Sequence, residues 1–202
     1  MIPKKPTAGI ILAAGISKRF GTPKQLVKIK GSYMIEYVIR ASLSSKLHKV
    51  FLVLGHHQNK ILKAITENIK SFQNSQLELI NNHQYRQGMS SSVRAGLASA
   101  NDSFGSVMFL LGDQPMVDSM LIDLMLKRFY KSDKNICVPL YKGKRGNPTI
   151  FSRKYFNLLQ SMEGDSGGRD IITANPDDVL KIETDSPACV YDIDTMDDLM
   201  AS

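Results

Sequence analysis

A short apolar segment followed by a glycine-containing basic loop constrains this chain more than any other feature. The interval 9–26 reads GIILAAGISKRFGTPKQL. Its apolar residues 10–12 are partly β-branched and lead into small residues, as expected of a buried strand in a parallel sheet. The loop after them contains Gly15 and Gly21 and the cations Lys18, Arg19 and Lys24. Small residues let backbone N–H groups approach a ligand, and cations neutralise phosphate. The segment therefore predicts a nucleoside triphosphate site at the carboxyl end of a first strand.

The spacing of this loop excludes two common phosphate-binding motifs. A P-loop requires a second glycine before its lysine, and Phe20 stands at that position. The dinucleotide motif G-x-G-x-x-G is absent as well. For an isolated loop of this kind, an ordinary strand–loop–helix joint with surface lysines remains the alternative.

The rest of the first two thirds of the chain alternates between strand and helix patterns. The expected strands are 10–12, 50–54, 77–80, 106–111 and 136–140, and the expected helices are 32–43, 57–69, 90–100 and 120–130. Such alternation predicts a mostly parallel sheet with helices on both faces and right-handed crossovers. The expected fold is therefore a three-layer, Rossmann-like α/β/α fold.

The alternation changes after residue 140. Short strands are expected at 148–151, 179–182 and 188–191, helical segments at 155–159, 171–175 and 195–200, and a glycine-rich loop at 164–168. No linker interrupts the sequence, so residues 1–202 are expected to form one domain. Within it, residues 141–188 are expected to form a small lobe that leans over the sheet.

Several separated motifs resemble one known family. The first loop fits L-A-A-G-x-S-x-R-x-G-x-x-K-x-L, and later come QGMSSSVRAG at 87–96, LGDQP at 111–115, RGNP at 145–148, GDSGGR at 164–169 and DIDT at 192–195. Together they resemble the nucleotidyltransferases that move a nucleoside monophosphate from an NTP to an acceptor. The resemblance is greatest to the molybdenum cofactor cytidylyltransferases and their guanylyltransferase relatives, and it runs from Gly9 to Leu199. It implies a Mg²⁺-dependent enzyme with the nucleotidyltransferase fold, whose RGNP and GDSGGR segments lie on the acceptor side.

Three aspartates are the candidate metal ligands. Asp113 follows the expected strand 106–111, at the same sheet edge as the Gly15 loop. Asp192 and Asp194 alternate in an extended segment and so share one side. The resemblance implies that Asp113 and Asp194 bind Mg²⁺, with Asp192 as a further participant. The alternatives are a turn-capping role for Asp113 and a helix N-cap role for Asp194.

The resemblance also implies roles for the first loop. Lys24 is expected to contact the α-phosphate, where charge develops in the transition state, and Arg19 the β- and γ-phosphates. With Asp113, these two cations are the expected catalytic residues. The nucleoside pocket is expected to be lined by the backbone of Leu12, Ala13, Ala14 and Gly15.

Other residues are assigned to the base and the acceptor. Gly55, Gly88 and Ser92 are expected near the base, although an N-cap role is equally open for each of the three serines. Arg145, Asn147, Asp165 and Arg169 are expected on the acceptor side, where two arginines can bind a phosphate. Asn147 stands where this family usually has histidine. Loop charges in water remain the alternative for both arginines.

Composition narrows the partners. The net charge of +7 favours anionic partners, but the basic residues are scattered, which argues for phosphorylated small molecules and against nucleic acid. The two cysteines have no metal-ligand spacing and are typical of a reducing compartment. No apolar run is long enough to cross a membrane, and no signal peptide is recognisable. A cytoplasmic protein is expected, with neither nucleic acid nor membrane as a partner.

The expected reaction transfers CMP from CTP to the terminal phosphate of molybdopterin or the molybdenum cofactor and releases pyrophosphate. A recipient molybdoenzyme or its chaperone is the expected protein partner. The nearest alternative is the same chemistry with GTP, or with another phosphorylated acceptor. A nucleotide-binding regulatory module would not need both Asp113 and Asp194. A Rossmann oxidoreductase is disfavoured by the missing G-x-G-x-x-G.

Overall fold

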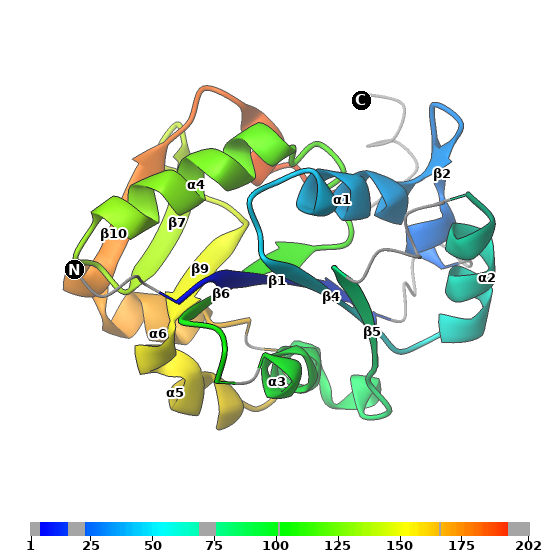
Figure 1. Ribbon diagram of the computed structural model, residues 1–202, viewed down its shortest axis with the longest axis horizontal. Coiled ribbons are helices and arrows are strands. Elements are labelled where there is room, and N and C mark those ends of the chain that lie inside the picture. Colours follow the sequence, from blue (N-terminus) through cyan, green and yellow to red (C-terminus); the bar gives the residue numbers. More distant parts are fainter. Residues whose placement is uncertain (1–4, 16–22, 69–75, 101, 166, 194–202) are drawn as a thin grey trace.

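A twisted sheet forms the middle layer of the protein (Figure 1). The structure is a computed structural model that describes residues 5–15, 23–68, 76–100, 102–165 and 167–193. In these residues, eight strands form the sheet in the order β10-β7-β9-β6-β1-β4-β5, with β8 paired to β7. The strands are β1 (Thr7–Ala13), β4 (Lys49–Leu54), β5 (Leu77–Asn81), β6 (Ser106–Leu111), β7 (Ile136–Tyr141), β8 (Lys144–Arg145), β9 (Thr149–Ser152) and β10 (Val179–Glu183). A separate hairpin joins β2 (Lys28–Ile29) to β3 (Ser32–Tyr33).

The sheet is mostly parallel, as the sequence predicts. Strand β1 pairs in parallel with β4 and β6, β4 with β5, and β7 with β10. Strand β9 is antiparallel to both of its neighbours, β6 and β7. The parallel strands end at one edge, where α/β proteins bind their ligands.

Helices cover both faces of the sheet, which confirms the three-layer prediction (Figure 1). Helices α1 (Met34–Leu43), α2 (Gln58–Asn68) and α4 (Ser119–Lys131) contribute to the hydrophobic cluster on one face. Helices α3 (Met89–Ser99), α5 (Phe156–Gln160) and α6 (Arg169–Ala174) contribute to the cluster on the other. None of the helices in the described residues is long and apolar enough to cross a membrane.

Alternation along β1 explains how one strand serves both clusters. Ile11 and Ala13 pack in the cluster under α1 and α4, whereas Ala8 and Ile10 pack in the cluster over α3. Successive side chains of a strand point to opposite faces, so a central strand needs an unbroken apolar run. Ile10 and Ile11 are both 0% exposed, and β1 is therefore fixed on both faces. This rigidity positions the loop that follows.

The segment 141–188, for which a lobe over the sheet is expected, also contributes to the sheet itself. It supplies β9 and β10, as well as α5 and α6 on the α3 face. The sequence does not reveal this contribution, because a short apolar run does not indicate which strands it will pair with.

One expected strand is wrong. Residues Pro187–Cys189 form a 3₁₀ helix rather than part of a strand over 188–191. Ser186 accepts a hydrogen bond from the Ala188 N–H at 3.2 Å, and Pro187 stands at the start of the turn. Both residues favour a helical turn over a sheet ladder. The expected closing helix at 195–200 lies outside the described residues.

Asp178, directly before β10, connects three segments of the chain near the edge of the sheet opposite β5. Its carboxylate accepts hydrogen bonds from the Asn135 amide, Lys154 Nζ at 2.7 Å and the Tyr155 hydroxyl at 2.8 Å. Burial alone would raise the pKa of Asp178, but the hydrogen bonds from Lys154, Asn135 and Tyr155 hold it well below its ordinary value. The folded state therefore stabilises the ionised carboxylate.

Asp178→Asn should lower the free energy of unfolding by about 2 kcal/mol near neutral pH, because it weakens several charge-assisted hydrogen bonds. A depressed folded-state pKa stabilises the fold above the unfolded pKa of about 4, and this contribution is lost as pH falls through the folded value. In urea unfolding, the difference between the variant and the wild type should therefore begin to shrink as pH falls below about 4 and vanish only below the folded-state pKa. Asp177→Asn, at the exposed neighbouring carboxylate, is the control, and an equal effect there would refute the assignment.

Candidate active site

Residues of the candidate site follow the ends of the central parallel strands. Gly15 comes after β1, Gly55 after β4, Asn82 after β5 and Asp113 after β6. Since these four strands are adjacent and parallel, the residues lie along one edge of the sheet. The candidate site is built from the loops at this edge.

Lys24 and Asp113 form an ion pair at its centre. Lys24 Nζ lies 2.9 Å from Asp113 Oδ2, and the two side chains are 11% and 34% exposed. The Lys24 side chain is thus mostly shielded from water, while part of the Asp113 side chain reaches solvent. The pairing brings a cation expected at the α-phosphate beside an expected metal ligand.

Two neighbouring contacts hold this pair at the end of β1. The amide of Gln25 donates to the Ala13 carbonyl at 2.9 Å, which fixes the short 3₁₀ helix Lys24–Leu26 against the strand. The Gly112 N–H donates to the Leu12 carbonyl at 3.0 Å. A Cβ on Gly112 would lie 2.9 Å from the Ala13 Cβ, so this close approach requires glycine.

A second carboxylate lies beside this turn. Gln114 Nε2 donates to Asp192 Oδ1 at 2.6 Å and to the Cys189 carbonyl at 3.3 Å. The Ile193 N–H donates to the Asp113 carbonyl at 3.2 Å. The segment that carries Asp192 is therefore hydrogen-bonded directly to the Asp113 turn, although 79 positions separate the two aspartates in the sequence.

Two of the expected site residues, Arg19 and Asp194, lie outside the described residues. Within the described part of the chain, no group of three His, Cys, Asp or Glu side chains gathers to hold a metal. Asp113 and Asp192 offer carboxylate oxygens, the donor type preferred by Mg²⁺ and Mn²⁺, which usually keep several waters. Residues of this kind fit a hydrated divalent cation, and Asp113 and Asp192 would hold it.

The backbone expected to line the nucleoside pocket is held by hydrogen bonds to its carbonyl groups. The carbonyls of Leu12, Ala13 and Ala14 accept hydrogen bonds from Gly112, the Gln25 side chain and His56, respectively. Gly15 is exposed, and among the described residues nothing lies within 4 Å of where its Cβ would stand. The strand end is therefore held in place at the edge of the sheet.

Ser92 belongs to a buried hydrogen-bond network, centred on a residue that the sequence analysis did not select. Asn82 is 4% exposed, and its Nδ2 donates to Ser91 Oγ at 2.9 Å and Ser92 Oγ at 3.0 Å. Its Oδ1 accepts from the Gln84 N–H at 2.9 Å, which fixes the orientation of the amide. The sequence offers no distinctive signal for Asn82, which lies two residues beyond the expected strand 77–80.

Gly88 and Asp165 form a contact between the base-side and acceptor-side segments. Asp165 Oδ1 accepts from the Met89 N–H at 3.2 Å, and the Gly164 carbonyl accepts from the Ser90 N–H at 3.0 Å. Gly88 has a φ of 94°, and a Cβ there would lie 2.5 Å from the Gly164 carbonyl oxygen. Glycine is required at position 88 on both grounds.

Asn147 is hydrogen-bonded to the segment that leads to Asp192, and Arg145 lies near Arg169. The Asn147 N–H donates at 2.8 Å to the Cys189 carbonyl, which Gln114 also contacts. Partial burial, together with the charge of the neighbouring Arg169, lowers the pKa of Arg145. Two guanidinium groups that repel each other are suited to binding a shared anion.

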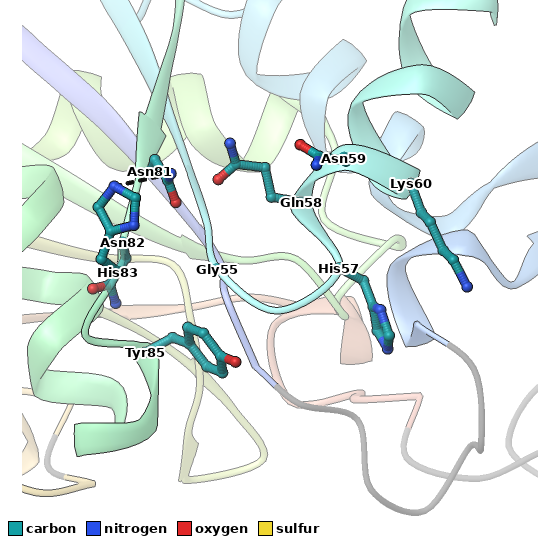
Figure 2. Close-up of a pocket in the computed structure, with 9 residues that line it drawn as sticks. All are labelled: Gly55, His57, Gln58, Asn59, Lys60, Asn81, Asn82, His83 and Tyr85. Carbon is teal, nitrogen blue, oxygen red and sulfur yellow. Dashed lines mark hydrogen bonds between the residues drawn. The ribbon is translucent and has the colours of Figure 1, made fainter.

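A pocket of about 440 Å³ opens at the ends of β4 and β5 (Figure 2). Figure 2 shows Tyr85 and the Asn81–His83 segment on one side of Gly55 and His57 and Lys60 on the other. A Cβ on Gly55 would lie 2.6 Å from the Tyr85 Cβ, so glycine is needed there for packing. Partial desolvation, with His56 and Lys60 nearby, lowers the pKa of His57. The pocket is lined by Gly55, His57, Gln58, Asn59, Lys60, Asn81, Asn82, His83 and Tyr85, and none of these is a carboxylate.

The chain is similar in sequence to one family model and to several known proteins. The MobA-like NTP transferase domain matches residues 9–179 of the chain. The chain is 25% identical to the molybdenum cofactor cytidylyltransferase of Escherichia coli K12, over 96% of this chain and 93% of that protein. It is 24% identical to a probable molybdenum cofactor guanylyltransferase of Thermococcus sibiricus, over 75% and 72%. It is also 26% identical to the nicotine blue oxidoreductase of Paenarthrobacter nicotinovorans, over 95% and 93%.

Solved structures share the fold. The Rv0371c protein of Mycobacterium tuberculosis H37Rv superposes with a TM-score of 0.84 at 24% identity, over 100% of both chains. Its manganese complex superposes with a TM-score of 0.77 at 22% identity, over 98% of this chain and 100% of that chain. The family match covers most of the chain and includes the Lys24 and Asp113 segments. The chain therefore belongs to the MobA-like NTP transferase domain family and is a nucleotidyltransferase.

Proposed function

We propose that the protein transfers CMP from CTP to the terminal phosphate of a molybdopterin-type cofactor. A terminal phosphate oxygen of the acceptor attacks the α-phosphorus of CTP and forms a new P–O bond. The bond between that phosphorus and the α–β bridging oxygen breaks, and pyrophosphate leaves with the electron pair. The observation that carries the proposal is the convergence of Lys24, Asp113 and Asp192 at the carboxyl edge of the sheet.

Each of the proposed site residues has a distinct role in this reaction. Lys24 would neutralise the charge that develops at the α-phosphate, with Arg19 on the β- and γ-phosphates. A divalent cation, Mg²⁺ in this proposal, would neutralise phosphate charge when bound by Asp113, Asp192 and Asp194. Arg145 and Arg169 would hold the acceptor phosphate in line, with Asn147 and Asp165 beside them. Support for a divalent metal comes from the manganese complex of the structural relative.

The nucleoside end is proposed to lie toward the pocket of Figure 2. Its lining supplies several neutral side-chain amides, whose hydrogen-bond donors and acceptors suit the edge of a base. Leu12, Ala13, Ala14 and Gly15 would border the nucleoside through their backbone, and Gly55, Gly88 and Ser92 would lie near the base. The triphosphate would then extend from this pocket toward Lys24.

Assays with the four NTPs test the nucleotide assignment. With purified cofactor and Mg²⁺, pyrophosphate release should be at least about tenfold faster with CTP than with GTP, ATP or UTP. The E. coli relative supports CTP, whereas the Thermococcus relative supports GTP. Faster release with GTP would replace the cytidylyl proposal with a guanylyl one, and turnover with a different phosphorylated acceptor would replace the cofactor.

The nicotine blue oxidoreductase supports a second candidate, an oxidoreductase, and a nicotinamide cofactor is the hydride carrier to test first. Hydride transfer does not require two carboxylates beside a lysine, which favours nucleotidyl transfer. Titration of the protein with NADH and NADPH, followed by fluorescence, separates the two. Saturable binding would support the reductase, and its absence would support the transferase.

The proposed setting is the cytoplasm, with a recipient molybdoenzyme or its chaperone as the protein partner. Cys137 and Cys189 are both buried free thiols, as in proteins from reducing compartments. Burial raises the pKa of Cys137 to about 12, so this thiol stays protonated and unreactive.

A further inference from the structure

Gln114 occupies a buried junction between three parts of the site. It directly follows Asp113, and its Nε2 donates to Asp192 Oδ1 at 2.6 Å and to the Cys189 carbonyl at 3.3 Å. The Cys189 carbonyl also accepts from the Asn147 N–H at 2.8 Å. The amide group therefore joins the Asp113 turn to the segment 189–192, and the Cys189 carbonyl links that segment to the acceptor-side loop.

The orientation of this amide is fixed by its partners. Both groups that it contacts are hydrogen-bond acceptors, so the NH₂ end must face them. Gln114 is only 2% exposed, which leaves little room for another rotamer. Its contact with Asp192 is short, as expected when a carboxylate accepts the hydrogen bond.

The other end of the amide is a buried oxygen. Among the described residues, Gln114 Oε1 is buried and has no hydrogen-bond partner. Such an oxygen is costly inside a protein unless something donates to it. Waters coordinated to a divalent cation are donors, so a buried amide oxygen next to two carboxylate-bearing segments fits a hydrated cation.

We propose that Gln114 is a positioning residue, which holds the Asp192 carboxylate beside Asp113 and so sets the affinity of the site for a divalent cation. The inference deepens the proposed function and rests on its metal assignment. Two carboxylates near each other repel, and Asp192 is exposed. The neutral donor of Gln114 keeps Asp192 at the site without neutralising it.

Mn²⁺ binding to the full chain tests this role without turnover. Free Mn²⁺ is measured by electron paramagnetic resonance for the wild type, Gln114→Met, Asp192→Asn and the double variant. Gln114→Met should weaken Mn²⁺ binding by about tenfold, the loss expected from an outer-shell hydrogen-bond partner, and Asp192→Asn, which alters a ligand, by at least as much. The double variant should lose clearly less than the sum of the two single losses, because Gln114 acts mainly through Asp192.

The matched control is Gln76→Met. Gln76 Nε2 donates to the Leu47 carbonyl at 2.7 Å, at the amino ends of β4 and β5 and so at the opposite edge of the sheet. This variant should leave Mn²⁺ affinity unchanged. If Gln114→Met does not fold, Gln114→Asn replaces it in this double-mutant cycle. Asparagine is one methylene shorter and withdraws the donor from Asp192.

The outcomes separate this inference from the proposed function. Additive losses in the double variant, or unchanged Mn²⁺ affinity in Gln114→Met, would overturn the inference. A non-additive cycle supports it even if the NTP assays identify a different nucleotide or acceptor. Asp113→Asn, measured in parallel, should also lose Mn²⁺ binding, and unchanged affinity there would remove the metal assignment on which both rest.

Discussion

Asp113→Asn should reduce turnover by about 10³-fold or more while the protein keeps its fold. The substitution retains the shape of the side chain but removes the charge that would hold the cation. It also removes the negative charge that faces the Lys24 ammonium 2.9 Å away. Both losses act on the step in which charge develops on the phosphates. Pyrophosphate release in the presence of Mg²⁺, CTP and cofactor measures the effect.

The fold should tolerate this change because Asp113 is 34% exposed. Ion pairs with one partly exposed member contribute about 1 kcal/mol or less to stability. Urea unfolding should therefore show only a small difference from the wild type. Asp118→Asn is the matched control, since Asp118 caps α4 through the Leu121 N–H at 2.9 Å and asparagine caps helices equally well. Wild-type turnover in Asp113→Asn would end the proposed mechanism.

The fold could be predicted because its signals are local. The apolar run of β1 and the regular alternation of later strands and helices required only spacing and residue type. The position of β9 could not be predicted, because an apolar run contains no information about the direction of its neighbours. The segment 188–191 has the composition of a strand, but Ser186 and Pro187 start a helical turn just before it.

Asp113 could be selected from the sequence because it follows a strand at the ligand-binding edge. Gln114 and Asn82 could not, since a neutral amide has no distinctive pattern until its partners are known. The partners of Gln114 lie 75 and 78 positions away in the chain. Asn82 contacts serines nine and ten positions away, but only the fold brings its amide to them. Such orienting residues are visible only in the structure.

The assignments of Arg19 and Asp194 remain predictions. Both residues lie outside the described part of the chain, so their assignments rest on the motifs that surround them in the sequence. Mn²⁺ binding by Asp194→Asn, compared with Asp197→Asn, would test the metal assignment without structural information.

Lys24→Met should have two effects of opposite sign. Turnover should fall by about 10²- to 10³-fold, because one preorganised cation is removed from the developing charge at the α-phosphate. Mn²⁺ binding to the nucleotide-free protein should instead become tighter by about tenfold, because the ammonium no longer competes for Asp113. Methionine has a similar length and suits the buried position of Lys24, which is 8% exposed.

This pair of effects distinguishes a catalytic lysine from a structural one. If Lys24 served only to stabilise the loop, its loss would disorder the site and weaken both turnover and Mn²⁺ binding. Lys24→Arg provides the control, because it keeps the positive charge but replaces a compact ammonium with a planar guanidinium. It should retain weak Mn²⁺ binding without nucleotide, yet recover turnover only in part. Tighter Mn²⁺ binding in Lys24→Met but not in Lys24→Arg would show that the charge of Lys24 opposes the cation until phosphates draw the lysine away.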